Sequence, residues 1–81
     1  MSKNVIRLSE ASVGKEYVIE RVEGHGLFKR RLLDMGLVPG EKVKVVRVAP
    51  LGDPIDLVTR GFDVSVRKSE ASLVWVRETE G

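Results

Sequence analysis

A succession of short segments rich in β-branched residues, each ended by a turn signal, constrains this chain more than any other feature. Segments 17–22, 43–48, 55–59, 62–66 and 73–76 have the composition and length of strands. Five or so short strands with one helix cannot form a large sandwich, but they can close on themselves and hide their edges. The sequence therefore predicts a mainly β fold, a small barrel of about five strands with one α-helix inserted after the first long strand.

Size and composition predict a single domain. The chain has 81 residues, 42% of them apolar and none of them cysteine, so we expect one core without disulfides or thiolate metal sites. Its apolar runs are too short to cross a bilayer, and its first residues lack the apolar core of a signal peptide. We therefore expect one domain over residues 1–81, located in the cytosol.

The charge is unevenly distributed along the chain. The net charge is +2, and residues 29–68 carry nine basic and five acidic groups, an excess of +4. This excess is too small to indicate nucleic-acid binding, but it gives one face a positive potential toward an acidic partner.

One segment, 27–35, has helical periodicity. Phe28, Leu32 and Met35 share the face that we expect in the core, and the opposite face is mostly polar. No Ser, Thr, Asp or Asn precedes the segment, so its first turn is expected to fray.

Three glycines are assigned structural roles. Gly36 suits the left-handed position after the helix, where Leu37 packs back on Leu32 in a Schellman motif. Gly40 belongs to the turn that follows, and Gly61 to the turn of the clearest hairpin.

The strands carry two further signals. The alternation slips between Val45 and Val46, which predicts a bulge or sharp bend. In the second arm of the hairpin, Phe62, Val64 and Val66 alternate with polar residues and are expected to point into the barrel.

The tetrapeptide Ser-Glu-Ala-Ser occurs at 9–12 and again at 69–72, each time before an apolar residue and a strand. We expect both copies to form the same short capped turn, with Ser9 as the N-cap of the first.

The chain has few groups for catalysis or metal binding. His25 is the only histidine and lies between two glycines, where no base is held in a fixed orientation. Asp53 and Asp56 flank a turn and are expected to be solvated turn residues rather than a cation site. No glycine pattern of a nucleotide-binding loop is present. We expect no enzyme activity, no cofactor and no metal site.

A small barrel of this kind is compatible with two kinds of binding module. Recognition of proline-rich peptides needs an exposed aromatic groove, and only Tyr17 and Trp75 remain once Phe28 and Phe62 are assigned to buried faces. A barrel that binds RNA, or a ribosomal or transcription partner, remains the alternative, although stacking aromatics and a strong basic excess are missing.

Several motifs, in order along the chain, resemble those of the FeoA family. Residues 31–40, Arg-Leu-Leu-Asp-Met-Gly-Leu-Val-Pro-Gly, resemble its central signature. Residues 8–14 resemble its N-terminal motif, residues 52–55 (Gly-Asp-Pro-Ile) its loop, and residues 61–71 its C-terminal motif. The resemblance covers roughly residues 6–76.

This resemblance implies an SH3-like β-barrel and a small cytosolic accessory or regulatory protein of bacterial ferrous iron uptake. It implies a partner, the cytosolic GTP-binding region of the membrane transporter FeoB, and no nucleic acid. Related domains end iron-dependent repressors of the DtxR type, but this chain carries neither the DNA-binding region nor the metal ligands of such repressors. A protein–protein role needs no metal ligands, which agrees with the side chains of this sequence.

The basic helix face and one loop form the expected docking surface. Lys29 and Arg30 lie beside the apolar Leu33, a composition suited to an acidic protein surface. The 50–54 loop adds an apolar residue at an exposed tip. The candidate partner-binding residues are therefore Lys29, Arg30, Leu33, Leu51 and Pro54.

Overall fold

The computed structural model describes residues 4–79. The elements in chain order are β1 (Val5–Arg7), η1 (Leu8–Glu10), β2 (Glu16–Val22), α1 (Gly26–Asp34), β3 (Lys42–Val48), β4 (Ile55–Thr59), β5 (Phe62–Val66), α2 (Lys68–Ala71) and β6 (Val74–Glu78). The mainly β architecture is confirmed, and α1 follows the first long strand as expected. The six strands are one more than the sequence suggested, because the short β1 also joins the sheet.

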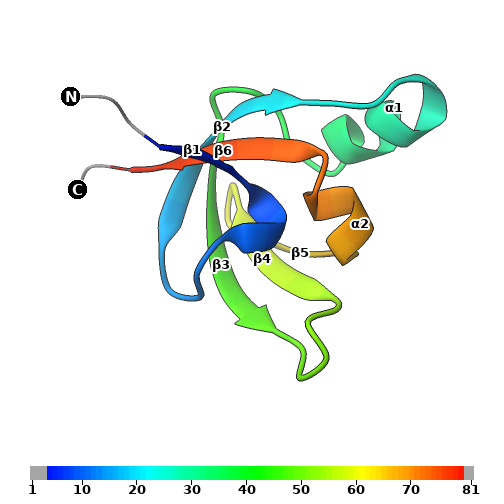
Figure 1. The fold of residues 1–81 in the computed structure, drawn as a ribbon. Helices are drawn as coiled ribbons and strands as arrows, with labels where there is room; N and C mark the ends of the chain where they lie inside the picture. The colour runs from blue at the N-terminus through cyan, green and yellow to red at the C-terminus, as the bar shows by residue number, and fades with distance from the viewer. Residues whose placement is uncertain (1–3, 80–81) are drawn as a thin grey trace.

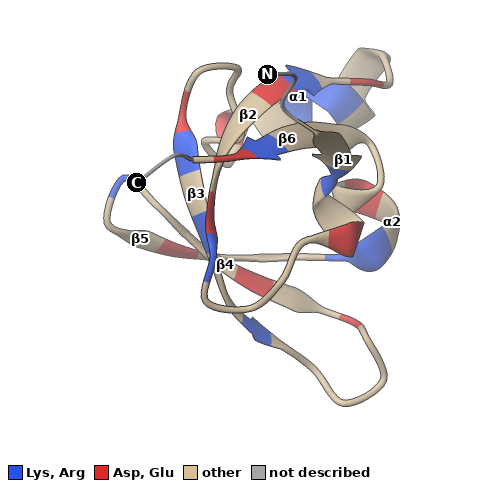
Figure 2. Cartoon of the chain, turned by 60° about the vertical axis from the view of Figure 1, so that its left-hand side comes forward, with Lys and Arg blue, Asp and Glu red and all other residues tan. Residues whose placement is uncertain are grey.

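All strand pairs are antiparallel, and the sheet has the order β1-β6-β2-β3-β4-β5. The sheet curls around one core, with α1 and α2 beside the same end of β6 (Figures 1 and 2). No helix among residues 4–79 is long and apolar enough to span a bilayer. Large side chains from most elements are fully buried in the core: Leu8, Ile19, Leu32, Leu37, Val43, Val45, Leu57, Val66, Val74 and Val76.

Two bulges bend the long strands. In β3 the pairing with β4 passes from Val45 to Arg47, so Val46 is the extra residue, and the predicted bulge is confirmed. A second irregularity lies between Ile19 and Arg21 in β2, where it pairs with β6. This second bulge was not predicted from the sequence. Because a bulge increases local twist and bends its strand, the two together let a six-stranded sheet of this size curl around one core.

The β4–β5 hairpin turns at Arg60 and Gly61, whose φ angles are 55° and 80°. Two positive φ angles in a two-residue loop define a type I′ turn, which matches the twist of the flanking strands. Phe62, predicted to point into the barrel, is 71% exposed, whereas Val66 is buried and Val64 partly buried. The alternation of β5 was predicted correctly, but the core ends before the turn and leaves Phe62 beyond it.

The two Ser-Glu-Ala-Ser copies form equivalent turns, but the capping residue differs from the prediction. Ser9 is not the N-cap of η1. The N-cap is Arg7, whose backbone N–H donates to Glu10 Oε1 at 3.2 Å. At α2 the N–H of Arg67 donates to Glu70 Oε1 at 2.8 Å in the same way. In both copies the glutamate side chain, three residues after the N-cap, satisfies a backbone donor at the start of the turn.

The end of α1 is a Schellman motif, as predicted. The N–H of Leu37 donates to the carbonyl of Leu32 at 3.2 Å, and the N–H of Gly36 donates to the carbonyl of Leu33 at 3.0 Å. Gly36 has a φ of 97°, a conformation in which a side chain is strained. At the other end, the N-cap His25 makes no side-chain capping bond.

Candidate functional site

The first turn of α1 presents apolar side chains to solvent. Leu27 is 84% exposed and Phe28 48% exposed, so the prediction that Phe28 lies in the core is wrong. The cause is the position of α1, which extends away from the curled sheet and covers it mainly with its second half (Figure 1). Only Leu32 of this helix is completely buried, so the first turn has no surface to pack against.

Two cations continue this exposed turn. Lys29 is partly exposed and Arg30 exposed, and in the described part of the chain neither forms an ion pair. The next residue differs, because Arg31 Nη1 lies 3.6 Å from the nearly buried carboxylate of Glu70 and ties α1 to α2. We call the four residues Leu27, Phe28, Lys29 and Arg30 the α1 knob.

The remaining candidate on the helix, Leu33, was expected beside Lys29 and Arg30 on the free face. It is instead partly buried and packs against the core. Leu33 is next to the buried Leu32, at the end of α1 that packs against the barrel through the Schellman motif. The apolar component of the exposed surface therefore comes from Leu27 and from Phe28, which had been expected on the core face.

The β3–β4 loop carries the other candidates. Leu51 is 96% exposed at its tip, and Pro54, also exposed, follows a cis peptide bond. The loop is closed by hydrogen bonds from Ala49 N–H to the Pro54 carbonyl (3.0 Å) and from Gly52 N–H to the Ala49 carbonyl (2.7 Å). In both ribbon views this loop and α1 lie at opposite ends of the molecule (Figures 1 and 2). The structure does not bring the two halves of the expected docking surface together.

The glycines assigned to structural roles all have left-handed backbones. Gly36, Gly40 and Gly61 have φ angles of 97°, 93° and 80°. Gly40 also donates its N–H to the carbonyl of Ile19 at 2.8 Å, which starts the pairing of the following strand with β2. Of the three, only Gly36 has a neighbour near the place of an added Cβ, with Thr59 Cγ2 at 3.4 Å.

The acidic and imidazole side chains do not gather into a metal site. No group of three or more His, Cys, Asp or Glu residues that could hold a metal ion occurs within residues 4–79. Asp53 Oδ1 accepts the backbone N–H of Lys68 at 2.9 Å, and Asp56 lies 3.7 Å from Arg47. His25 is exposed in its loop. The aspartates therefore have local structural partners, one at the start of α2 and one across the β3–β4 pair.

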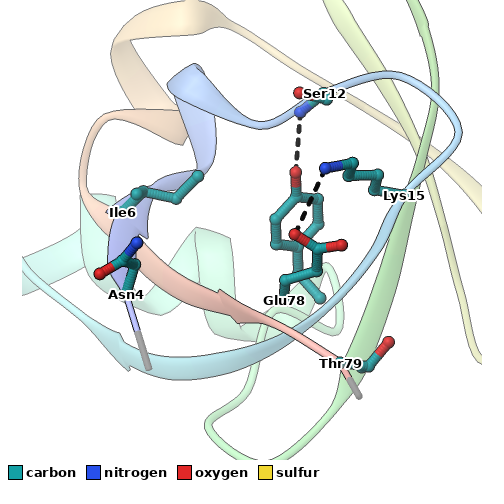
Figure 3. Close-up of a pocket in the computed structure, with 7 residues that line it drawn as sticks. Asn4, Ile6, Ser12, Lys15, Glu78 and Thr79 are labelled. Carbon is teal, nitrogen blue, oxygen red and sulfur yellow. Dashed lines mark hydrogen bonds and ion pairs between the residues drawn. The ribbon is translucent and has the colours of Figure 1, made fainter. Parts of the chain in front are cut away.

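A cavity of about 420 Å³ opens where β1, β2 and β6 meet the loop after η1 (Figure 3). Tyr17 lines its depth and accepts the backbone N–H of Ser12 on its hydroxyl at 2.9 Å. Lys15 Nζ and Glu78 Oε1 approach to 3.4 Å beside it. None of these lining residues was singled out as a site in the sequence, because they are far apart along the chain. A neutral hydroxyl and one ion pair give the cavity no net charge with which to select a ligand.

A family model and a curated relative match the same family. The FeoA domain family model matches residues 6–78. The chain is 44% identical over 71 residues, 88% of its length, to an Fe(2+) transport protein A/Fe(2+) transporter FeoB fusion protein of Porphyromonas gingivalis. It spans only 8% of the length of that fusion protein.

Two solved structures extend the match to three dimensions. A FeoA-like protein from Clostridium acetobutylicum has a TM-score of 0.87 and 33% identity, covering 100% of this chain and 93% of the other. A zinc complex of Stenotrophomonas maltophilia FeoA, described as a procaryotic SH3 domain protein, has a TM-score of 0.74 and 33% identity over 85% of this chain and 86% of the other. With the family match over residues 6–78 and the six-stranded curled sheet, these likenesses show that the chain belongs to the FeoA family, which is associated with ferrous iron transport.

Proposed function

We propose that this protein is a non-enzymatic accessory or regulatory subunit of bacterial ferrous iron uptake that binds the cytosolic GTP-binding region of a FeoB-type transporter. The observation that carries the proposal is the fusion homologue, in which a FeoA domain and FeoB form one polypeptide. Fusion keeps two modules at high effective concentration, which benefits modules that act on each other. A FeoA domain that acts on FeoB needs a binding surface for it, with or without a peptide link between the two.

The α1 knob is the surface best suited to this role. Leu27 and Phe28 are large apolar side chains on an element that extends away from the barrel. The centres of protein–protein interfaces are enriched in aromatic residues and depleted of charge, with polar residues at their rim. Lys29 and Arg30 supply such a rim, and they favour an acidic partner surface.

The β3–β4 loop is the second candidate surface on the same molecule. Leu51 is a single exposed apolar residue, and no second large apolar side chain of the described chain accompanies it on the loop. A single side chain buries less apolar area than the Leu27–Phe28 pair, so we place the docking surface on α1.

Binding to the purified cytosolic region of a FeoB-type transporter, with and without guanine nucleotide, tests the proposal. Leu27→Ser with Phe28→Ser should weaken binding at least tenfold, because both apolar anchors are lost. Leu51→Ser is the matched control and should bind like the wild type. Loss of binding in Leu51→Ser alone would place the docking surface on the loop. Failure of the wild-type protein to bind under any nucleotide condition would contradict the proposed function itself.

A further inference from the structure

The outer edge of β5 is a free strand edge. β5 is the last strand in the sheet order, and no strand within residues 4–79 pairs with its outer side. The two-residue turn makes Thr59 and Phe62 a hydrogen-bonded pair, so Val64 and Val66 also direct their backbone groups to β4. Asp63 and Ser65 therefore direct their N–H and C=O groups away from the sheet.

This free edge is short and sharply bounded. At Arg67 the next outward-directed N–H donates to Glu70 Oε1, and the Arg67 carbonyl accepts the N–H of Ala71 at 2.9 Å. Beyond Ser65 the backbone is thus already used by the cap of α2. Four groups remain for another strand, the N–H and C=O of Asp63 and of Ser65.

Apart from its short length and one charged residue, β5 lacks the usual devices that prevent edge pairing. It contains no lysine and no proline, and its register with β4 is continuous, so no bulge turns it away. Phe62, at its start, is an exposed aromatic residue. Asp63 is its one charged residue. A free edge of this kind favours the addition of another strand.

We propose that β5 pairs with β5 of a second copy of this chain. The two strands run antiparallel, and a twofold axis passes between the two Val64 residues. In this register Asp63 lies opposite Ser65 of the second copy, and Ser65 lies opposite its Asp63. Both are hydrogen-bonded pairs, so the four free groups on each copy are all satisfied. On the other face Val64 meets its own symmetry mate, and Phe62 lies opposite Val66 of the second copy.

The charges favour a second copy over an unrelated strand. Asp63 and Arg67 are both exposed, and neither forms an ion pair in the described part of the chain. Twofold pairing about Val64 places each Asp63 diagonally across from both Arg67 and Asp63 of the other copy, and the long Arg67 side chains can reach and offset the two carboxylates. The symmetry repeats this ion pair, so the edge is complementary to itself.

Sedimentation velocity over a wide concentration range tests the pairing, without the transporter. A single strand pair is a small interface, so we expect a rapid monomer–dimer equilibrium that is visible only at high concentration. Ser65→Pro removes an outward N–H, leaves the β4 ladder intact and should abolish the dimer. Ser65→Thr, which keeps that N–H, should dimerise like the wild type. A wild-type chain that stays monomeric, a mass that rises beyond the dimer, or a dimer that survives Ser65→Pro would overturn the proposal.

Charge variants test the same register should Ser65→Pro not fold. Asp63→Arg and Arg67→Asp alone should each weaken dimerisation about tenfold, because two attractive contacts become repulsive. The double variant, Asp63→Arg with Arg67→Asp, restores opposite charges across the axis and should dimerise again. Equal dimerisation of all four proteins would show that these side chains do not face each other.

Discussion

Arg60 is a non-glycine residue with a left-handed backbone, and it is also one half of an ion pair. Its φ is 55°, and its Nη2 atom lies 2.7 Å from Glu41 Oε1. The hydrogen bond and the charge of the guanidinium hold the pKa of Glu41 below its ordinary value. The pair links the β4–β5 turn to the residue that precedes β3.

This pair predicts a pH dependence of stability. The pKa of Glu41 is lower in the folded state than in the unfolded chain. Its contribution is therefore present above the unfolded pKa of about 4.3 and is lost as the pH falls through the folded value. Glu41→Gln should reduce the loss of stability on acidification, measured by urea unfolding between neutral pH and about pH 3. Glu16→Gln removes a carboxylate that forms no ion pair in the described chain, and it is the matched control for the loss of one negative charge. An identical acid limb in Glu41→Gln would contradict the assignment.

Substitution of Gly36 should lower the free energy of unfolding more than substitution of a glycine of similar φ elsewhere in the chain. Gly36→Ala should lower the free energy of unfolding by about 1–2 kcal/mol, the cost of a left-handed residue. Its Cβ also approaches Thr59 Cγ2. Gly52 has a similar φ of 86°, but nothing lies within 4 Å of an added Cβ. Because its loop is free to relax, Gly52→Ala should cost less in parallel thermal melts. Equal costs would mean that backbone strain alone, and not the Schellman motif, sets the effect.

Two aromatic residues show that burial cannot be predicted from periodicity alone. Phe28 and Phe62 occupy positions with the correct periodicity, yet both are exposed. Periodicity gives the direction of a side chain within its own element, but burial needs another element in that direction. At both positions the element extends past the core. Tyr17, which was assigned no role from the sequence, is buried and lines the cavity, where its hydroxyl is hydrogen-bonded.

In β6, Trp75 lies between arginines of both neighbouring strands. Arg7 of β1 and Arg21 of β2 are its cross-strand partners, and their guanidinium carbons lie 4.4 Å and 5.0 Å from the ring centroid. Arg7 Nη1 also donates to the carbonyl of Ser72 at 2.6 Å. These side chains connect three strands at the end of the sheet near α2.

The two arginines should therefore contribute unequally to stability. Arg21→Met removes one cation–π contact and an exposed ion pair with Glu23 (Nη2 to Oε2, 3.4 Å), which contributes little, and should cost about 0.5–1 kcal/mol. Arg7→Met also removes a charged hydrogen bond and should cost about 1–2 kcal/mol. Trp75 is the only tryptophan, so its fluorescence reports both the local change and the urea transition. A fluorescence spectrum that neither variant alters would contradict the stacked arrangement.

Turns and strands were predictable element by element because their signals are local. The bulge at Val46 and the helix stop at Gly36 depend on a few neighbouring residues, and both are confirmed. The helix face was less predictable. Leu33 lies against the core and Leu27 in solvent because of the way α1 meets the barrel, and that orientation depends on contacts distant in sequence.

The arrangement of the whole molecule separates surfaces that the sequence had joined. The sequence showed an apolar and basic helix and an apolar loop tip, which we combined into one docking surface. The fold places them at opposite ends (Figure 1). Nothing in the local pattern gives the direction of either element relative to the sheet, so neither the separation of the two surfaces nor the packing of Leu33 against the core was predictable from the sequence.

Because the two surfaces are separate, reversing charges on α1 should affect transporter binding more than reversing the same number of charges elsewhere. Lys29→Glu with Arg30→Glu should leave folding intact, because exposed charges contribute little to stability. It should slow association with the transporter's cytosolic region, most strongly at low salt, because screening removes long-range attraction. Lys42→Glu with Lys44→Glu, on β3 and outside α1, changes the net charge equally and is the matched control. If the two variants slow association to the same extent, net charge and not the α1 knob governs the encounter. If the α1 variant alone slows it, and added salt removes the difference, the basic rim of the knob faces the partner during approach.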